Sequence, residues 1–164
     1  MPWDIYDFTT ASQFRRQLSR VTANGGGDEP ESVLDAMYIA LNSDWRSQRT
    51  HKTVVLMTDA DTHPNLHERT STAPIGGVAQ IIQLIQETPH VMLFIVAPEY
   101  EAYQQIQRAA FEADRKVIFN PVPDASDDNR GLVKVNIRPL MEMISRVVSA
   151  TSIDIASRFG DTTE

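Results

Sequence analysis

The sequence contains no cysteine, which excludes both a disulfide framework and a cysteine-ligated metal site. It also lacks a long apolar stretch, since the longest run, VMLFIVA, has 7 residues whereas a membrane-spanning helix needs about 20. The first residues, MPWDIYDF, are acidic and do not follow the basic and then apolar order of a signal peptide. We therefore expect a cytoplasmic protein with no membrane partner.

Basic residues are in the minority, because 22 acidic side chains outnumber 15 lysines and arginines and the formal net charge is −7. This balance disfavours nucleic acid as a partner and is compatible with cations or proteins. With 164 residues, 41% of them hydrophobic, the chain is long enough for one domain with a substantial core. We place this domain at residues 1–150 and a polar tail at residues 151–164.

Segments with apolar residues at helical spacing alternate with continuous apolar runs. Continuous runs such as KTVVLMTDA are typical of strands buried on both faces of a sheet. The alternation predicts an α/β, Rossmann-like fold with a mainly parallel sheet and helices on both faces. All methionines after Met1 fall on these apolar faces and are expected in the core. The expected strands are 52–60, 90–98 and 116–122. The apolar faces of the five expected helices consist, in chain order, of Phe14, Leu18 and Val21; Val33, Leu34, Met37 and Leu41; Val78, Ile81, Ile82 and Ile85; Tyr103, Ile106 and Ala110; and, after Pro139, Leu140, Met143, Ile144, Val147 and Val148.

Two acidic segments are expected to meet at one edge of this sheet. Three glycines precede Asp28 and Glu31 near the start of the second helix, and Asp59 and Asp61 lie at the carboxyl tip of the first expected strand. The helix that precedes a parallel strand begins at that strand's carboxyl edge, where open α/β sheets bind ligands. Carboxylates gathered there would repel one another unless a cation such as Mg²⁺ neutralised them. The alternative is a capping box, with Asp28 as the N-cap and Glu31 as the N3 residue of the helix.

The order of these segments resembles a von Willebrand factor A domain, of the kind seen in integrin β subunits and in bacterial relatives. The resemblance rests on DFTTASQF, GGGDEPESVLDAM, SDWRSQRTHKTVVLMTDADTH, GGVAQIIQLIQETPHVMLFIV and the last helix, and it covers about residues 7–150. It implies a metal-ion-dependent adhesion site, in which an acidic group of a protein partner completes the coordination of Mg²⁺, with Mn²⁺ or Ca²⁺ as alternatives. In that site Glu31 would match the ligand of the second loop, and Asp59 would match the aspartate of the third loop, which usually acts through water. Asp28 and the Pro30 carbonyl would serve a second cation, although Gly26 stands where the family has asparagine.

The first part of the A domain has no counterpart in this sequence. The family's Asp-x-Ser-x-Ser loop follows a central apolar strand, and neither feature is found before Gly25. The chain thus resembles the C-terminal two-thirds of the domain, and a cation would bind weakly because the principal ligands are missing. Loss of that strand would leave residues 53–58 as an uncovered sheet edge. We expect a homo-oligomer through this edge, a rearranged sheet, or a complementing chain that supplies the strand.

These patterns favour a non-enzymatic protein-binding module with a weak or vestigial cation site at the acidic corner. One alternative is a Toprim-like enzyme that uses Asp59 and Asp61 to hold Mg²⁺ for nucleic-acid chemistry. Another is a gene fragment with only a scaffold role. His63 and His67, four residues apart and near Asp61, could share a helical face and hold zinc.

Overall fold

The computed structural model describes residues 8–20, 30–45, 51–70, 76–124 and 131–159. Within these residues, helices and strands alternate along the chain from α2 to α5. The elements are α1 (Ala11–Leu18), α2 (Val33–Leu41), β1 (Lys52–Met57), α3 (Gly77–Glu87), β2 (Val91–Ala97), α4 (Glu101–Glu112), β3 (Lys116–Pro121), the 3-10 helix η1 (Gly131–Lys134) and α5 (Ile137–Phe159).

The strands form one parallel sheet in the order β1-β2-β3. Lys52 of β1 is level with Val91 of β2, and Met92 of β2 is level with Lys116 of β3. The central strand, β2, is buried at every position, as its continuous apolar run predicts. The expected α/β fold with a parallel sheet is therefore confirmed.

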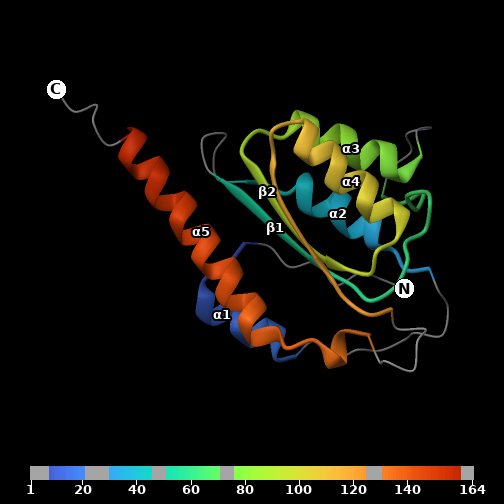
Figure 1. Cartoon of the computed structure of the whole chain (residues 1–164), viewed down its shortest axis with the longest axis horizontal. Coiled ribbons are helices and arrows are strands. Elements are labelled where there is room, and N and C mark those ends of the chain that lie inside the picture. The colour runs from blue at the N-terminus through green and yellow to red at the C-terminus, as the bar shows by residue number, and fades with distance from the viewer. Residues whose placement is uncertain (1–7, 21–29, 46–50, 71–75, 125–130, 160–164) are drawn as a thin grey trace.

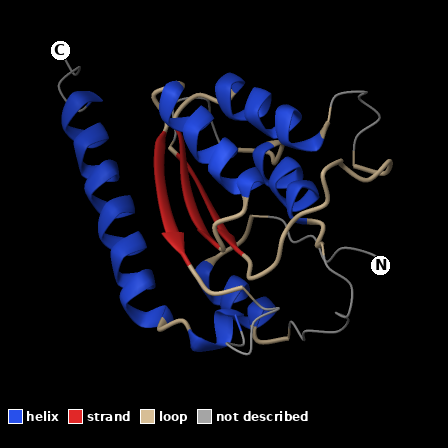
Figure 2. Cartoon of the chain, turned by 45° about the vertical axis from the view of Figure 1, so that its right-hand side comes forward, coloured by secondary structure: helices blue, strands red, loops and turns tan. Residues whose placement is uncertain are grey.

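Helices cover both faces of this sheet (Figures 1 and 2). On one face lie α2, α3 and α4, where side chains such as Ile81 and Ile106 are completely buried. On the other face α5 packs Leu140 and Ile144 against residues of β2, including Phe94. Burying a side chain of this size stabilises a fold by about 1.5–3 kcal/mol, so the two layers hold the sheet between them.

Strand β1 is less buried than the sequence predicts. Lys52 and Val54 are buried on the face covered by α2, whereas Val55 and Met57 are exposed on the other face. The expectation of a strand buried on both faces is wrong because β1 is the edge of the described sheet and α5 packs over β2 and β3. Met57 is therefore outside the core, and so is Met141 on α5. A continuous apolar run does not distinguish an edge strand from a central one.

The first two helices begin in different ways. Thr10 caps α1 and forms a reciprocal capping box with the side chain three residues later. Helix α2 begins at Val33, after an N-cap serine whose side chain makes no capping hydrogen bond. Glu31 lies before this helix, so it is not the N3 residue of a capping box, and that interpretation is wrong. Asp28, its supposed N-cap, lies outside the described residues.

The first and last helices differ from expectation in length or burial. Pro139 lies in the first turn of α5, as predicted, but the helix crosses the boundary drawn at residue 150 and continues to Phe159. Figure 1 shows its C-terminal half projecting past the sheet. Phe14, on the expected apolar face of α1, is 57% exposed, and Val21 lies outside the described residues.

Candidate functional site

The carboxyl edge of the sheet joins two segments that are distant in the sequence. The backbone N–H of Glu31 donates to the carbonyl oxygen of Asp61 at 2.9 Å, and the N–H of His63 donates to the carbonyl oxygen of Glu31 at 3.0 Å. These two bonds make a parallel bridge between Glu31 and Thr62. The segment before α2 therefore lies beside the loop that follows β1, with the Glu31 side chain exposed.

Thr62 was not identified from the sequence, although it organises this edge. It is 6% exposed, and its hydroxyl accepts the N–H of Leu34, in the first turn of α2, at 3.3 Å. The same hydroxyl donates to the carbonyl oxygen of His63. A side chain 28 positions away thus satisfies a helix N–H that the N-cap serine does not. A threonine in a polar loop carries no local signal of such a role.

The carboxylate of Asp59 contacts a third segment. Its Oδ2 accepts the backbone N–H of Leu132 at 2.9 Å, at the start of η1. Gly131 beside it has a φ of +47°, and a Cβ at that position would collide with the Asp59 side chain. The contact ties the tip of β1 to the segment that leads into α5. The resemblance implied a water-mediated cation ligand here, whereas the structure shows a carboxylate bonded to a backbone N–H.

Tyr103 of α4 is hydrogen-bonded to the loop that follows β1. It is 0% exposed, and its hydroxyl donates to the carbonyl oxygen of Ala60 at 2.8 Å. Burial raises the pKa of the phenol; a hydrogen bond with Thr58 opposes this, and the negative charges of Asp61 and Glu31 raise the pKa further. Both carboxylates act on the same hydroxyl, which is consistent with their closeness at this edge.

Asp35 fixes the next part of the loop. It is 2% exposed on α2, and its Oδ1 accepts the N–H of His67 at 2.9 Å. The ring Nδ1 of His67 in turn accepts the N–H of Arg69 at 3.1 Å. His63 and His67 are exposed and belong to a non-helical segment, so they do not share a helical face as the zinc hypothesis supposed.

The described residues do not by themselves provide a set of metal ligands. No group of three or more histidine or acidic side chains within them is arranged to hold an ion. One oxygen of Asp59 and one of Asp61 already accept backbone N–H groups. Asp28 lies outside the described residues. A cation at Glu31, Asp59 and Asp61 would therefore need further ligands, and the same holds for the Toprim-like use of the two aspartates.

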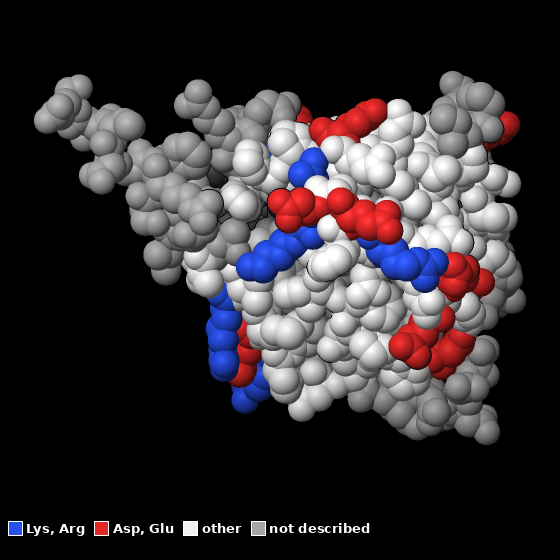
Figure 3. Space-filling model, turned by 45° about the horizontal axis from the view of Figure 1, so that its top comes forward, with Lys and Arg blue, Asp and Glu red and all other residues white. Residues whose placement is uncertain are grey.

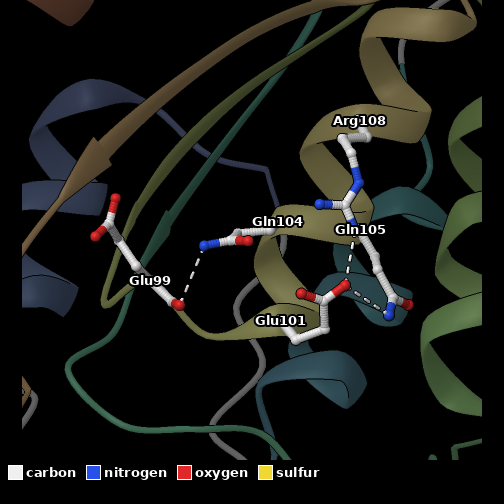
Figure 4. Close-up of polar contacts among 5 residues, drawn as sticks. All are labelled: Glu99, Glu101, Gln104, Gln105 and Arg108. Carbon is white, nitrogen blue, oxygen red and sulfur yellow. Dashed lines mark hydrogen bonds and ion pairs between the residues drawn. The ribbon is translucent and has the colours of Figure 1, made fainter.

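The start of α4 adds exposed acidic residues to this edge of the sheet (Figure 4). The Glu101 carboxylate accepts hydrogen bonds from Arg108 at 2.7 Å and from Gln105 at 3.1 Å. The Arg108 contact, with help from Gln105, lowers the pKa of Glu101. The backbone carbonyl of Glu99 accepts a hydrogen bond from Gln104 at 3.2 Å. On the face seen in Figure 3, side chains of both signs are interspersed rather than gathered into one patch.

Comparison with models of known protein families matches residues 4–129 to the von Willebrand factor A domain. The match begins ahead of α1 and extends past β3, so it includes both segments of the Glu31–Thr62 bridge. A search of curated proteins and a search of solved structures found no match. Among the described residues, no helix combines the length and apolar character needed to cross a membrane.

Proposed function

The chain belongs to the von Willebrand factor A domain family, and we propose that it is a non-enzymatic protein-binding module whose ligand surface is the carboxyl edge of its sheet. Family membership supports an interaction role. The observation that carries the proposal is the Glu31–Thr62 bridge, which presents an exposed carboxylate at that edge. Open α/β sheets bind their ligands at the carboxyl ends of the strands.

A divalent cation, Mg²⁺ first, would act at this surface only as a weakly held link to the partner. A backbone hydrogen bond joins Glu31 to Asp61, and Asp59 would have to share its carboxylate with Leu132. Mg²⁺ takes hard oxygen ligands and keeps several waters. An acidic group of the protein partner would supply a ligand that the described residues lack, so binding of partner and cation would be linked.

The binding proposal is tested by comparing two charge reversals that change the net charge equally. Glu31→Arg lies at the carboxyl edge, and Glu112→Arg lies on an exposed position at the far end of α4. Proteins crosslinked to the wild-type chain in cells are identified by mass spectrometry. We expect partners retained by Glu112→Arg and lost by Glu31→Arg, and equal capture by both variants would contradict the proposed surface.

The cation is tested separately, by isothermal titration with Mg²⁺ and Mn²⁺. We expect weak heat with the wild-type chain and none with Glu31→Gln or Asp59→Ala. If the wild-type chain gives no heat, the proposal of a cation is wrong, whereas the proposed protein-binding surface is not contradicted. Mg²⁺-dependent nuclease or DNA-relaxation activity that disappears in Asp59→Ala would instead favour the Toprim-like alternative.

A further inference from the structure

Among the residues that the structure describes, no strand pairs with the outer side of β1. Within the described sheet it pairs only with β2. The N–H groups of Lys52 and Thr58 donate toward β2, and successive residues of a strand direct their backbone groups to opposite sides. The N–H and carbonyl groups of Thr53, Val55 and Met57 therefore point away from β2.

The same strand exposes apolar side chains. Val55 and Met57 are 42% and 37% exposed, while the residues level with them on β2, Phe94 and Val96, are 1% and 0% exposed. The strand contains no proline and no acidic residue, and its one charged side chain, Lys52, is 3% exposed. It thus has none of the proline or exposed charge by which proteins protect an edge strand from pairing.

We propose that β1 pairs antiparallel with β1 of a second copy of this chain, about a two-fold axis that passes through Val55. Val55 then faces Val55 of the second copy, and Thr53 faces Met57. These are the residues whose backbone groups point outward, so facing residues exchange about six hydrogen bonds in total. The two three-stranded sheets become one continuous sheet.

Two-fold symmetry favours the antiparallel orientation. An antiparallel pair places the same strand of both copies in one self-complementary contact, as in a closed dimer. A parallel arrangement would align like ends and would not close with two-fold symmetry.

The register also matches side chains on the face covered by α2. Val54 is buried there and Leu56 is half-buried. Each Val54 lies opposite Leu56 of the second copy, so an apolar pair connects the two cores across the new strand boundary. The occupant that fits this edge is therefore the same strand reversed, without a change in either core.

This interface is separate from the proposed ligand surface. It uses residues 53–57, whereas Glu31 bridges to Thr62, beyond the end of the strand. If the Glu31→Arg variant still dimerises normally, pairing through β1 stays supported even where the proposed ligand surface proves wrong. A strand supplied by a different protein is the competing occupant, and it would leave the purified chain monomeric.

The first test is the mass of the purified chain by light scattering and sedimentation over the micromolar range. We expect a dimer for the wild-type chain and a monomer for Val55→Asp, with the dissociation constant raised at least about tenfold because two carboxylates would face each other on the axis. Phe111→Asp is the control, since Phe111 is 77% exposed on α4 and its variant should still dimerise. A monomeric wild-type chain overturns the proposal.

The second test uses the lack of cysteine in the chain to read the register. Facing residues that exchange hydrogen bonds have Cα atoms about 5.5 Å apart, which is within the range of a disulfide. Val55→Cys should therefore crosslink into a covalent dimer on mild oxidation. Thr53→Cys should not, because its two copies would be about 14 Å apart. Crosslinking of Thr53→Cys as fast as Val55→Cys, or no crosslinking of Val55→Cys, overturns the register.

Discussion

The carboxylate of Asp59 accepts the backbone N–H of Leu132 at 2.9 Å, across 73 positions of the sequence. This contact ties the tip of β1 to η1, and η1 leads directly into α5. Helix α5 in turn packs Leu140 and Ile144 on the second face of the sheet. The aspartate that the family resemblance assigned to a cation therefore has a structural role in this chain.

Replacing Asp59 should weaken the fold. Asp59→Ala leaves the N–H of Leu132 without its acceptor and should lower the free energy of unfolding by about 1 kcal/mol. Asp59→Asn keeps an acceptor oxygen and should lower the free energy of unfolding by less. Urea unfolding of the three proteins measures the difference, and equal losses in the two variants would show that the hydrogen bond is not the cause.

Gly131 should tolerate a side chain poorly. Its φ of +47° is unfavourable for other residues, and a Cβ there meets the Asp59 side chain. Gly131→Ala should lower the free energy of unfolding by about 1–2 kcal/mol. Gly76→Ala is the matched control, because Gly76 has a φ of −55° and its nearest contact to an added Cβ is 3.7 Å away. Thermal or urea unfolding that finds the two variants equally stable would contradict this account.

Tyr103 should make the fold sensitive to alkaline pH. Its pKa is raised by burial in the native state, so the stabilisation is complete below the unfolded pKa of about 10 and is lost as pH rises through the higher native value. The free energy of unfolding of the wild-type chain should therefore fall more steeply above about pH 10 than that of Tyr103→Phe.

At neutral pH, Tyr103→Phe should be the less stable protein by about 0.5–1.5 kcal/mol, because the carbonyl of Ala60 loses its donor. Urea unfolding of both proteins across the pH range gives both quantities. Parallel pH profiles for the two proteins would exclude the phenol as the titrating group.

Thr62 should stabilise the start of α2 from outside the helix. Thr62→Val keeps the shape of the side chain but removes the acceptor for the N–H of Leu34, and it should lower the free energy of unfolding by about 1 kcal/mol. Thr62→Ser retains the hydroxyl and should lower the free energy of unfolding by less. Hydrogen exchange of the Leu34 amide gives a local measure: it should speed up in Thr62→Val alone, and unchanged exchange would mean that this contact is not formed.

Several elements could be predicted from the sequence because each one is specified by its own residues. The run VMLFIVA has no polar position and predicts a strand buried on both faces, which is what β2 is. Tyr103, Ile106 and Ala110 recur at helical spacing, and all three are completely buried on α4. The same local signal failed for β1, since apolar residues do not reveal which strand has a neighbour on only one side.

The amino-acid sequence by itself determined the α/β alternation, the apolar face of each core helix and the presence of acidic groups near two loops. The tertiary structure alone decided that Glu31 pairs with the loop after β1 instead of capping α2, that Thr62 caps that helix, and that Asp59 bonds to Leu132. The physical reason is that periodicity reports how a segment buries its own side chains. A hydrogen-bond partner, or an open strand edge, depends on which distant segments the topology brings together.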